Sequence, residues 1–120
     1  MNMIASTLAA AALSLAAVAP AHSFDAKDQY LEDLAVCDAY GTAVTYVASL
    51  QQNGYTPDQV RAITVLPGMV HKDWVDMILS SIDTVYDFTP PPFPTTAERE
   101  AFLDRLTPNY VRECMKRKGH

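Results

Sequence analysis

Two cysteines, Cys37 and Cys114, are the residues of this 120-residue chain best suited to covalent chemistry. They lie far apart in the sequence, and neither belongs to a CxxC motif or to a spacing typical of zinc ligands. If the chain is exported, as its N-terminal residues indicate, an even cysteine count favours a structural disulfide. Such a bridge would stabilise the fold by about 4.5 kcal/mol through loop entropy. Two buried free thiols, or one reactive thiol, are the alternatives.

The most regular polar pattern is a row of aspartates. The aspartates are Asp73, Asp76, Asp83 and Asp87, and Ser80 lies between the second and the third. These five polar residues recur every three or four positions, which places them on one face of a helix. A row of like charges costs some self-repulsion, so it suits docking of a cationic partner protein. An ordinary solvated helix face is the alternative.

The sequence predicts no catalytic, metal or cofactor site. Nucleophilic catalysis needs a base next to Ser, Cys or Thr, and neither a G-x-S-x-G motif nor a Gly-rich phosphate loop is present. His71 follows Pro67-Gly68 by a few residues and is expected to be exposed near a helix start. A metal site formed by His71, Asp73 and Asp76 would lack a further evident ligand. We therefore do not expect an enzyme.

Residues 1–23 indicate export. They contain no Asp, Glu, Lys or Arg, and 16 of the 23 are apolar. The apolar run at 4–18 is shorter than the roughly 20 residues that span a membrane, and small-residue cleavage options follow it, after Ala21 or Ser23. A signal peptide is expected, with an uncleaved anchor as the alternative. No later segment is apolar enough to span, so the expected location is the periplasm or the exterior.

Residues 24–120 suit one small domain. The whole chain has a net charge of −5, and all of this charge lies in residues 24–120. An acidic balance argues against non-specific binding to nucleic acid. The expected partner is therefore another protein, and the sequence does not indicate the oligomeric state.

Helical signals occur in five segments of this domain, and none shows convincing strand alternation. The segments are 25–53, 56–66, 70–88, 95–106 and 107–118. Asp25 is a candidate cap for the first. Capping boxes at Thr56/Gln59 and Thr95/Glu98 mark two starts, and Thr107-Pro108 predicts a third. Residues 89–96 form a proline-rich crossover, since four prolines in five residues cannot be helical.

The apolar positions predict which faces are buried. In the first segment they form two adjacent stripes, and Thr42, Thr45 and Gln52 fall on the opposite, polar side. In the third segment Ile78, Ile82 and Val85 point inward with Trp74 and Met77. Most tyrosines are also expected in the core. A Cys37–Cys114 bridge would clamp the last helix onto the first. The predicted fold is therefore an all-α bundle of four to five helices closed by one disulfide.

The order of these features resembles that of uncharacterised small two-cysteine helical periplasmic proteins of Gram-negative bacteria and their phages. The features are Cys37 in a long first helix, Asn53-Gly54-Tyr55-Thr56 before a short second helix, Val85-Tyr86, a proline stretch and Cys114. The resemblance implies a disulfide-closed periplasmic helical domain and brings no catalytic residues. A looser, architectural likeness exists to acid-activated periplasmic chaperones and to periplasmic immunity proteins.

The expected function is that of an exported, non-enzymatic protein-interaction module of the inhibitor or immunity type. It would bind a cationic partner through Asp73, Asp76, Asp83 and Asp87. The alternative function is that of an acid- or stress-responsive periplasmic chaperone, which would expose apolar surface at low pH.

Overall fold

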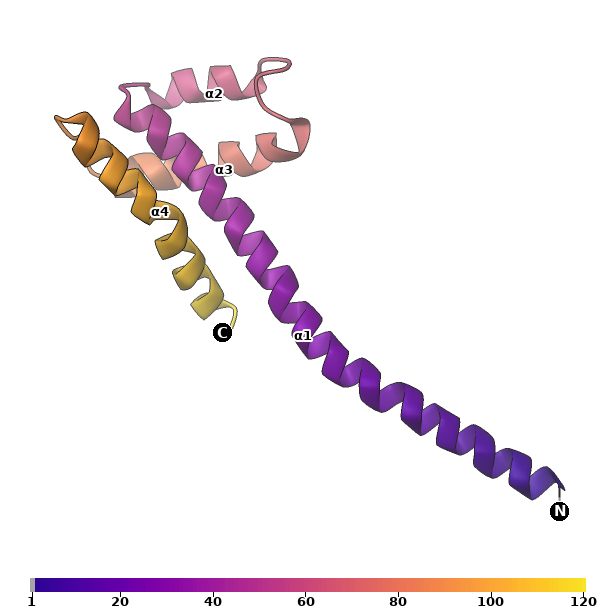
Figure 1. The fold of residues 1–120 in the computed structure, drawn as a ribbon. Helices are drawn as coiled ribbons and strands as arrows, with labels where there is room; N and C mark the ends of the chain where they lie inside the picture. Colours follow the sequence, from indigo (N-terminus) through magenta and orange to yellow (C-terminus); the bar gives the residue numbers. More distant parts are fainter. Residues whose placement is uncertain (1) are drawn as a thin grey trace. The chain divides into compact units, whose positions relative to one another are not determined.

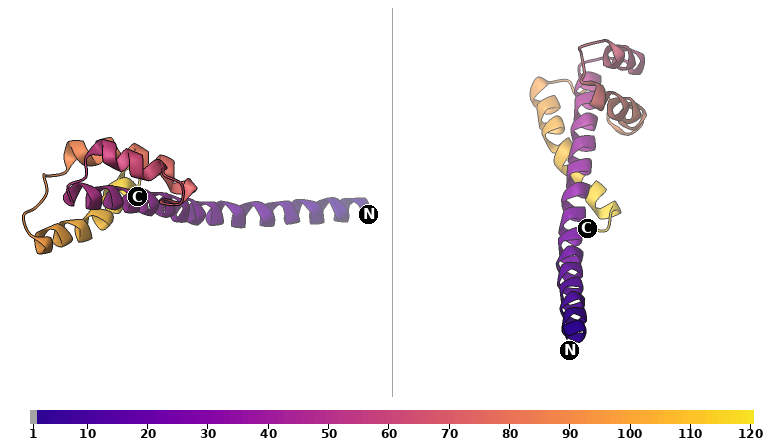
Figure 2. Two further views of the ribbon diagram at one scale, coloured as in Figure 1. Left: turned by 90° about the horizontal axis from the view of Figure 1, so that it is seen from above. Right: turned by 90° about the vertical axis from the view of Figure 1, so that its right-hand side faces the viewer.

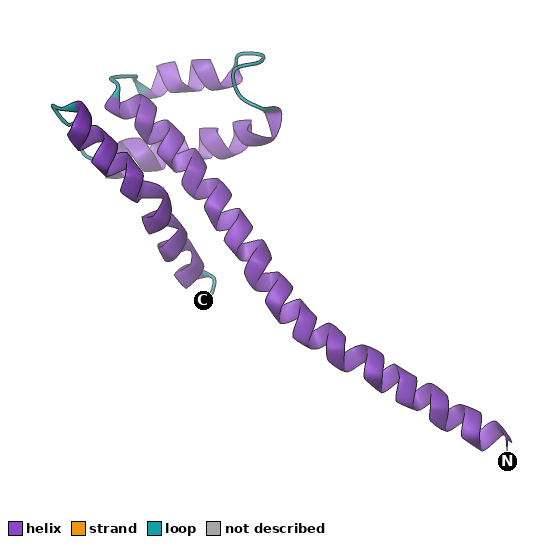
Figure 3. Ribbon diagram, in the orientation of Figure 1, coloured by secondary structure: helices purple, strands orange, loops and turns teal. Residues whose placement is uncertain are grey.

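The computed structural model describes the backbone of residues 2–120 and the side chains of residues 25–120. It contains four helices, shown in Figure 1: α1 (Asn2–Gln52), α2 (Pro57–Val65), α3 (Lys72–Phe88) and α4 (Thr96–Arg117). The chain is 79% helical, and Figure 3 shows no strand in the part that is described. A disulfide joins α1 to α4. The predicted all-α bundle, closed by a bridge between its first and last helices, is confirmed.

Contacts divide the chain into two compact units, Met1–Asp33 and Leu34–His120. In the first unit the side-chain amide of Gln29 donates to the Asp33 carboxylate at 3.0 Å, one helical turn away. The signal peptide predicted for residues 1–23 lies outside the residues whose side chains are described, so it stays a prediction. Within the described part, no helix carries an apolar stretch long enough to cross a membrane.

The beginnings of α2 and α4 follow the predicted capping signals. The Thr56 hydroxyl accepts from the Gln59 N–H at 3.2 Å, and the Gln59 side chain accepts in return from the Thr56 N–H at 2.9 Å. The Thr95 hydroxyl accepts from the Glu98 N–H at 3.1 Å. These bonds satisfy backbone donors that have no partner within the first helical turn. Asp25, in contrast, does not cap α1, because that helix begins at Asn2 in an Ala-rich segment.

The last two predicted segments form one helix, so the expected helix start at Thr107-Pro108 is wrong. Pro108 lies inside α4, although a proline there removes one helical hydrogen bond and costs about 3 kcal/mol. The Thr107 hydroxyl does not cap a helix, but lies 2.6 Å from the Thr45 hydroxyl and 3.3 Å from the Gly41 carbonyl oxygen of α1. Packing against α1 therefore outweighs the local stop signal.

The main core lies among α1, α2 and α3. Its buried members are aliphatic or small: Ala43, Val44, Val47, Ala48, Val60, Ile78, Ile82 and Val85. Phe102, Leu103 and Leu106 of α4 pack against it as half-buried residues. The inward positions predicted for α3 are confirmed, with Ile78, Ile82 and Val85 buried and Trp74 and Met77 half-buried at the edge. In Figure 2, α2 and α3 run side by side, as their contacts also show.

A second contact joins α1 to α4 through small residues. The Cys37–Cys114 bridge has a Cα–Cα distance of 5.7 Å, and both cysteines are buried with Met115. One turn along α1 lies Gly41, where a Cβ atom would be only 3.3 Å from Thr107 Cγ2 and 3.4 Å from Val111 Cγ2. The missing side chain therefore allows α4 to approach closely.

Two buried amides hold the proline-rich crossover onto the end of α1. Gln51 Nε2 donates to the Pro90 carbonyl at 2.8 Å, and the Phe93 N–H donates to Gln52 Oε1 at 2.9 Å. Gln52 was expected on the polar side of α1, as was Thr45, but Gln52 is 2% exposed and Thr45 is half-buried. These side chains are buried because the crossover and α4 cover this side of α1 in the tertiary structure.

Candidate interaction surface

The four predicted aspartates lie on α3 and all are exposed: Asp73, Asp76, Asp83 and Asp87. We call this set the acidic face. The helix that carries it is rigidly held, because Ile78, Ile82 and Val85 on its other side are buried in the core. Its first turn is capped by His71, whose Nδ1 accepts from the Asp73 N–H at 3.3 Å. His71 is exposed at a helix start, as predicted.

Arg61 of α2 neutralises part of the acidic face, because it pairs with one of the four aspartates. Its guanidinium bonds to the Asp83 carboxylate and to the Asp58 carboxylate, each at 3.0 Å. The Asp83 side chain is 82% exposed, and exposed ion pairs of this kind contribute only about 0–1 kcal/mol. Asp73 lies 3.5 Å from His71 Nδ1. The sequence pattern did not reveal the pairing of Asp83 with Arg61, because the two residues are 22 positions apart.

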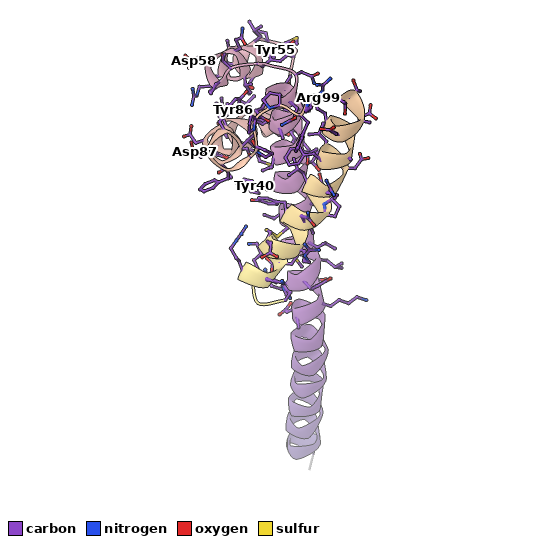
Figure 4. The ribbon with its side chains drawn as sticks, turned by 90° about the vertical axis from the view of Figure 1, so that its left-hand side faces the viewer. Tyr40, Tyr55, Asp58, Tyr86, Asp87 and Arg99 are labelled. Atoms are coloured by element: carbon purple, nitrogen blue, oxygen red, sulfur yellow. A yellow bond between two sulfur atoms is a disulfide. The ribbon has the colours of Figure 1, made fainter. Side chains whose placement is uncertain are left out.

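Asp76 and Asp87 form no ion pair with any other described residue. Figure 4 shows Asp87 on α3 and Asp58 on α2 on the same side of the helix pair. The surface formed by α2 and α3 is therefore mainly negative, and two of its carboxylates are available to a positively charged group.

An apolar pocket of about 300 Å³ lies between α1 and the connection from α2 to α3. It was not predicted from the sequence. Its lining comes from three elements: Thr42, Ala43 and Tyr46 of α1, Met69 and Val70 of the connection, and Trp74 and Ile78 of α3. We call this the apolar pocket. Its open side is accessible because Met69 is 60% exposed.

The connection that forms one wall of the apolar pocket is shaped by Pro67 and Gly68. Gly68 has a φ of +80°, a conformation that glycine adopts without steric cost. The α2 helix ends at Val65, and the next turn leaves Val65 and Leu66 61% and 53% exposed. A short break between two helices thus presents large apolar side chains to water. Together with Met69, we call them the apolar rim.

A second pocket, of about 360 Å³, lies next to the disulfide. Two aromatic and two cationic residues line it, Tyr40, Tyr110, Arg117 and Lys118, together with Val36 and Cys114. The Arg117 guanidinium lies 5.8 Å from the centre of the Tyr110 ring, a distance typical of a cation–π contact. The charge of the second pocket is opposite to that of the acidic face, because its charged lining residues are cationic.

Three of the six tyrosines, Tyr46, Tyr86 and Tyr110, pack half-buried against the core, and the other three are exposed, contrary to the prediction for most of them. Tyr30, Tyr40 and Tyr55 are 44%, 37% and 40% exposed. Tyr86 is half-buried, and its hydroxyl donates to the Tyr55 carbonyl oxygen, which joins α3 to the turn before α2. Burial raises the pKa of Tyr86 above its ordinary value of 10.0, because the charged phenolate would lose water.

The titratable side chains of residues 25–120 do not gather in groups of three that could hold a metal ion. The arrangement offers instead a negative helix face and an apolar pocket. Comparisons of the chain with family models, with curated proteins and with solved structures find no match.

Proposed function

We propose that this chain is an exported, non-enzymatic protein-interaction module that binds a cationic partner protein. The acidic face carries this proposal, since Asp76 and Asp87 are exposed on a helix whose other side is fixed in the core. Oppositely charged surfaces attract each other over long distances and select the correct partner. An inhibitor or immunity protein that covers a basic surface of its target would use such a face. The disulfide is compatible with export, because it is stable in oxidising compartments.

Charge reversal on the acidic face tests this proposal. The full chain, carrying an affinity tag, would be used to capture proteins from the periplasmic extract of the producing bacterium at several salt concentrations. We expect a partner that is retained at low salt and lost with D76K/D87K. The matched control is E100K/D104K, which makes the same charge change at exposed positions of α4. Equal loss with both double variants, or capture independent of salt, would contradict a specific role for the acidic face.

A second candidate function is that of a chaperone that opens under acid stress. The exposed apolar rim favours it, because large apolar side chains already face water where an unfolded client could bind. Circular dichroism and binding of an apolar dye, followed from pH 7 to pH 2, test this function. A chaperone of this kind would bind more dye at low pH while it keeps most of its helix. A protein that binds no dye at pH 2 would rule the function out.

A further inference from the structure

The second pocket lies between two helices that are covalently joined. Its volume of about 360 Å³ falls within the range of small-ligand sites, roughly 300–1,000 Å³. Val36 and Tyr40 of α1 form one wall, and the other lining residues come from the last turns of α4 and its C-cap. The disulfide fixes the two walls relative to each other, because Cys114 lines the pocket and is bonded to Cys37 of α1. A ligand therefore meets a site that is already formed, which lowers the cost of binding.

The charge of this pocket selects an anion. Both charged lining residues, Arg117 and Lys118, are cationic, and none of the six lining residues is Asp or Glu. Arg117 is exposed and forms no ion pair with another side chain of residues 25–120. The nearest carboxylate along α4 is that of Glu113, one turn earlier, and it lies 3.4 Å from the Lys116 ammonium. The Arg117 guanidinium is therefore available to an anion that enters the pocket.

Cations at the end of a helix also offset the negative end of its dipole, and this is the simplest alternative role for Arg117. The last carbonyl groups of α4, however, already have backbone donors. The Lys118 N–H donates to the carbonyl oxygens of Cys114 and Met115, at 3.2 Å and 3.1 Å. The Arg117 guanidinium is not needed as their hydrogen-bond donor, and it lies over the ring of Tyr110, a wall of the pocket.

Two tyrosines determine what the rest of the ligand should be. Tyr40 is 37% exposed and Tyr110 is half-buried, and both line the pocket. Aromatic rings attract one another in offset or edge-to-face contacts beyond the gain from burial alone. A guanidinium binds a carboxylate through two parallel hydrogen bonds.

We propose that the second pocket binds a small aromatic carboxylate. The ring of the ligand lies against Tyr40 and Tyr110, and its carboxylate binds Arg117. This inference goes beyond the proposed function and does not depend on it, because none of the pocket residues belongs to the acidic face.

Four small ligands of similar size separate the contribution of the ring from that of the charge. Hydrocinnamate is the probe. Its amide removes the charge, phenylpropylamine reverses it, and cyclohexylpropionate keeps the charge but replaces the aromatic ring. Each ligand is titrated into the full chain with its disulfide intact, while the amide signals of the protein are followed by two-dimensional NMR.

We expect hydrocinnamate to shift the amide signals of Val36, Tyr40 and Arg117, and to leave that of Trp74 in the apolar pocket unchanged. It should bind about fivefold more tightly than its amide, because hydrogen bonds between charged groups are stronger than neutral ones. It should bind at least about twofold more tightly than cyclohexylpropionate, because of the aromatic contacts. Phenylpropylamine should bind most weakly.

Variants with matched controls test the two contacts separately. Arg117→Gln should lower the affinity for hydrocinnamate about fivefold. Arg112→Gln, which makes the same charge change at another exposed position of α4, should leave it unchanged. Tyr40→Ala should weaken binding, whereas Tyr55→Ala, at a 40% exposed tyrosine outside the pocket, should not. Circular dichroism of each variant confirms that the helices are intact.

Four results would overturn the inference. Equal affinities for hydrocinnamate and its amide, or equal losses with Arg117→Gln and Arg112→Gln, would exclude the contact with Arg117. Binding of phenylpropylamine or cyclohexylpropionate as tight as that of hydrocinnamate would exclude the assigned charge or ring. A shift confined to Trp74 would place the ligand in the apolar pocket, and no shift with any ligand would show that the second pocket does not bind this class. Partner capture with D76K/D87K tests the proposed function independently of all these results.

Discussion

The contacts that α1 makes with α3 and with α4 differ in kind. Toward α3 it contributes Val47 and Ala48 to an aliphatic core with Ile78, Ile82 and Val85. Toward α4 it presents three small residues, each four positions after the last. Cys37 forms the disulfide, Gly41 allows a close approach, and Thr45 contacts the Thr107 hydroxyl. Apolar burial therefore holds α3. The apolar residues of α4 are only half-buried against that core, and a covalent bond and a close approach at Gly41 also join α4 to α1.

The difference also appears on the outer surfaces. The surface of α2 and α3 is mainly acidic and includes the exposed apolar rim, whereas α4 ends in the basic residues Lys116 and Arg117. The α3 side thus combines a firmly buried inner face with an outer face whose aspartates are exposed. Variants that act on one contact and not on the other test this comparison.

Loss of the disulfide should have the largest effect, and it acts on the α4 contact. The bridge closes a loop with a sequence separation of 77, for which chain entropy predicts a stabilisation of about 4.5 kcal/mol. We expect C37S/C114S to lower the free energy of unfolding by about this amount in a urea titration. Wild-type protein kept reduced should behave like the double variant. A midpoint that does not change would show that α4 is held mainly by its other contacts.

Truncation of a side chain in the aliphatic core should have the next largest effect on stability, because it weakens the contact between α1 and α3. Ile82 is fully buried at 0% exposure, so Ile82→Ala should cost about 3–4 kcal/mol of unfolding free energy. Thr84→Ala, at an exposed position of the same helix, should change it by less than about 0.5 kcal/mol. Urea titration of both variants checks this. Similar costs for the two would contradict the proposed division between the inner and outer sides of α3.

A side chain at Gly41 should weaken the close approach of α4. Gly41→Leu would place atoms against Thr107 and Val111, and overpacking of this kind costs about 1–3 kcal/mol. Ala35→Leu on the exposed side of α1 is the control and should be almost neutral. Thermal unfolding followed by circular dichroism measures both. A fully stable Gly41→Leu protein would mean that α4 can move away from α1 without loss.

The smallest effect concerns Tyr86, and the part of it that depends on ionisation appears only at high pH. Burial raises the pKa of Tyr86, so the fold favours its neutral form. This contribution is complete below pH 10.0, the ordinary value for the unfolded chain, and is lost as the pH rises through the higher folded value. We expect the unfolding free energy to fall more steeply between pH 9 and pH 11 in the wild type than in Tyr86→Phe.

Tyr40→Phe is the control for this pH dependence, because Tyr40 is exposed. At pH 8, Tyr86→Phe should cost about 0.5–1.5 kcal/mol, since it removes the hydrogen bond to the Tyr55 carbonyl oxygen. Parallel pH profiles for the wild type and Tyr86→Phe would contradict the role of burial.

The sequence predicted which residues form the acidic face, but not which residues from other elements contact them. The spacing of the four aspartates predicted one exposed face of α3, and the structure shows all four exposed. The pairing of Asp83 with Arg61 and the apolar pocket depend on residues distant in sequence. Periodicity within one helix carries no information about which other element faces it.

The amino-acid sequence by itself determined the local elements: the capping box at Thr56, the N-cap at Thr95, the buried stripe of α3 and the crossover at the prolines. These depend on interactions between residues a few positions apart, which every chain carries in its order of residues. Only the tertiary structure decided that Pro108 lies within α4, that Gln52 is buried and that Gly41 meets Thr107. In each case, contacts between distant segments outweigh a local preference of a few kcal/mol or less.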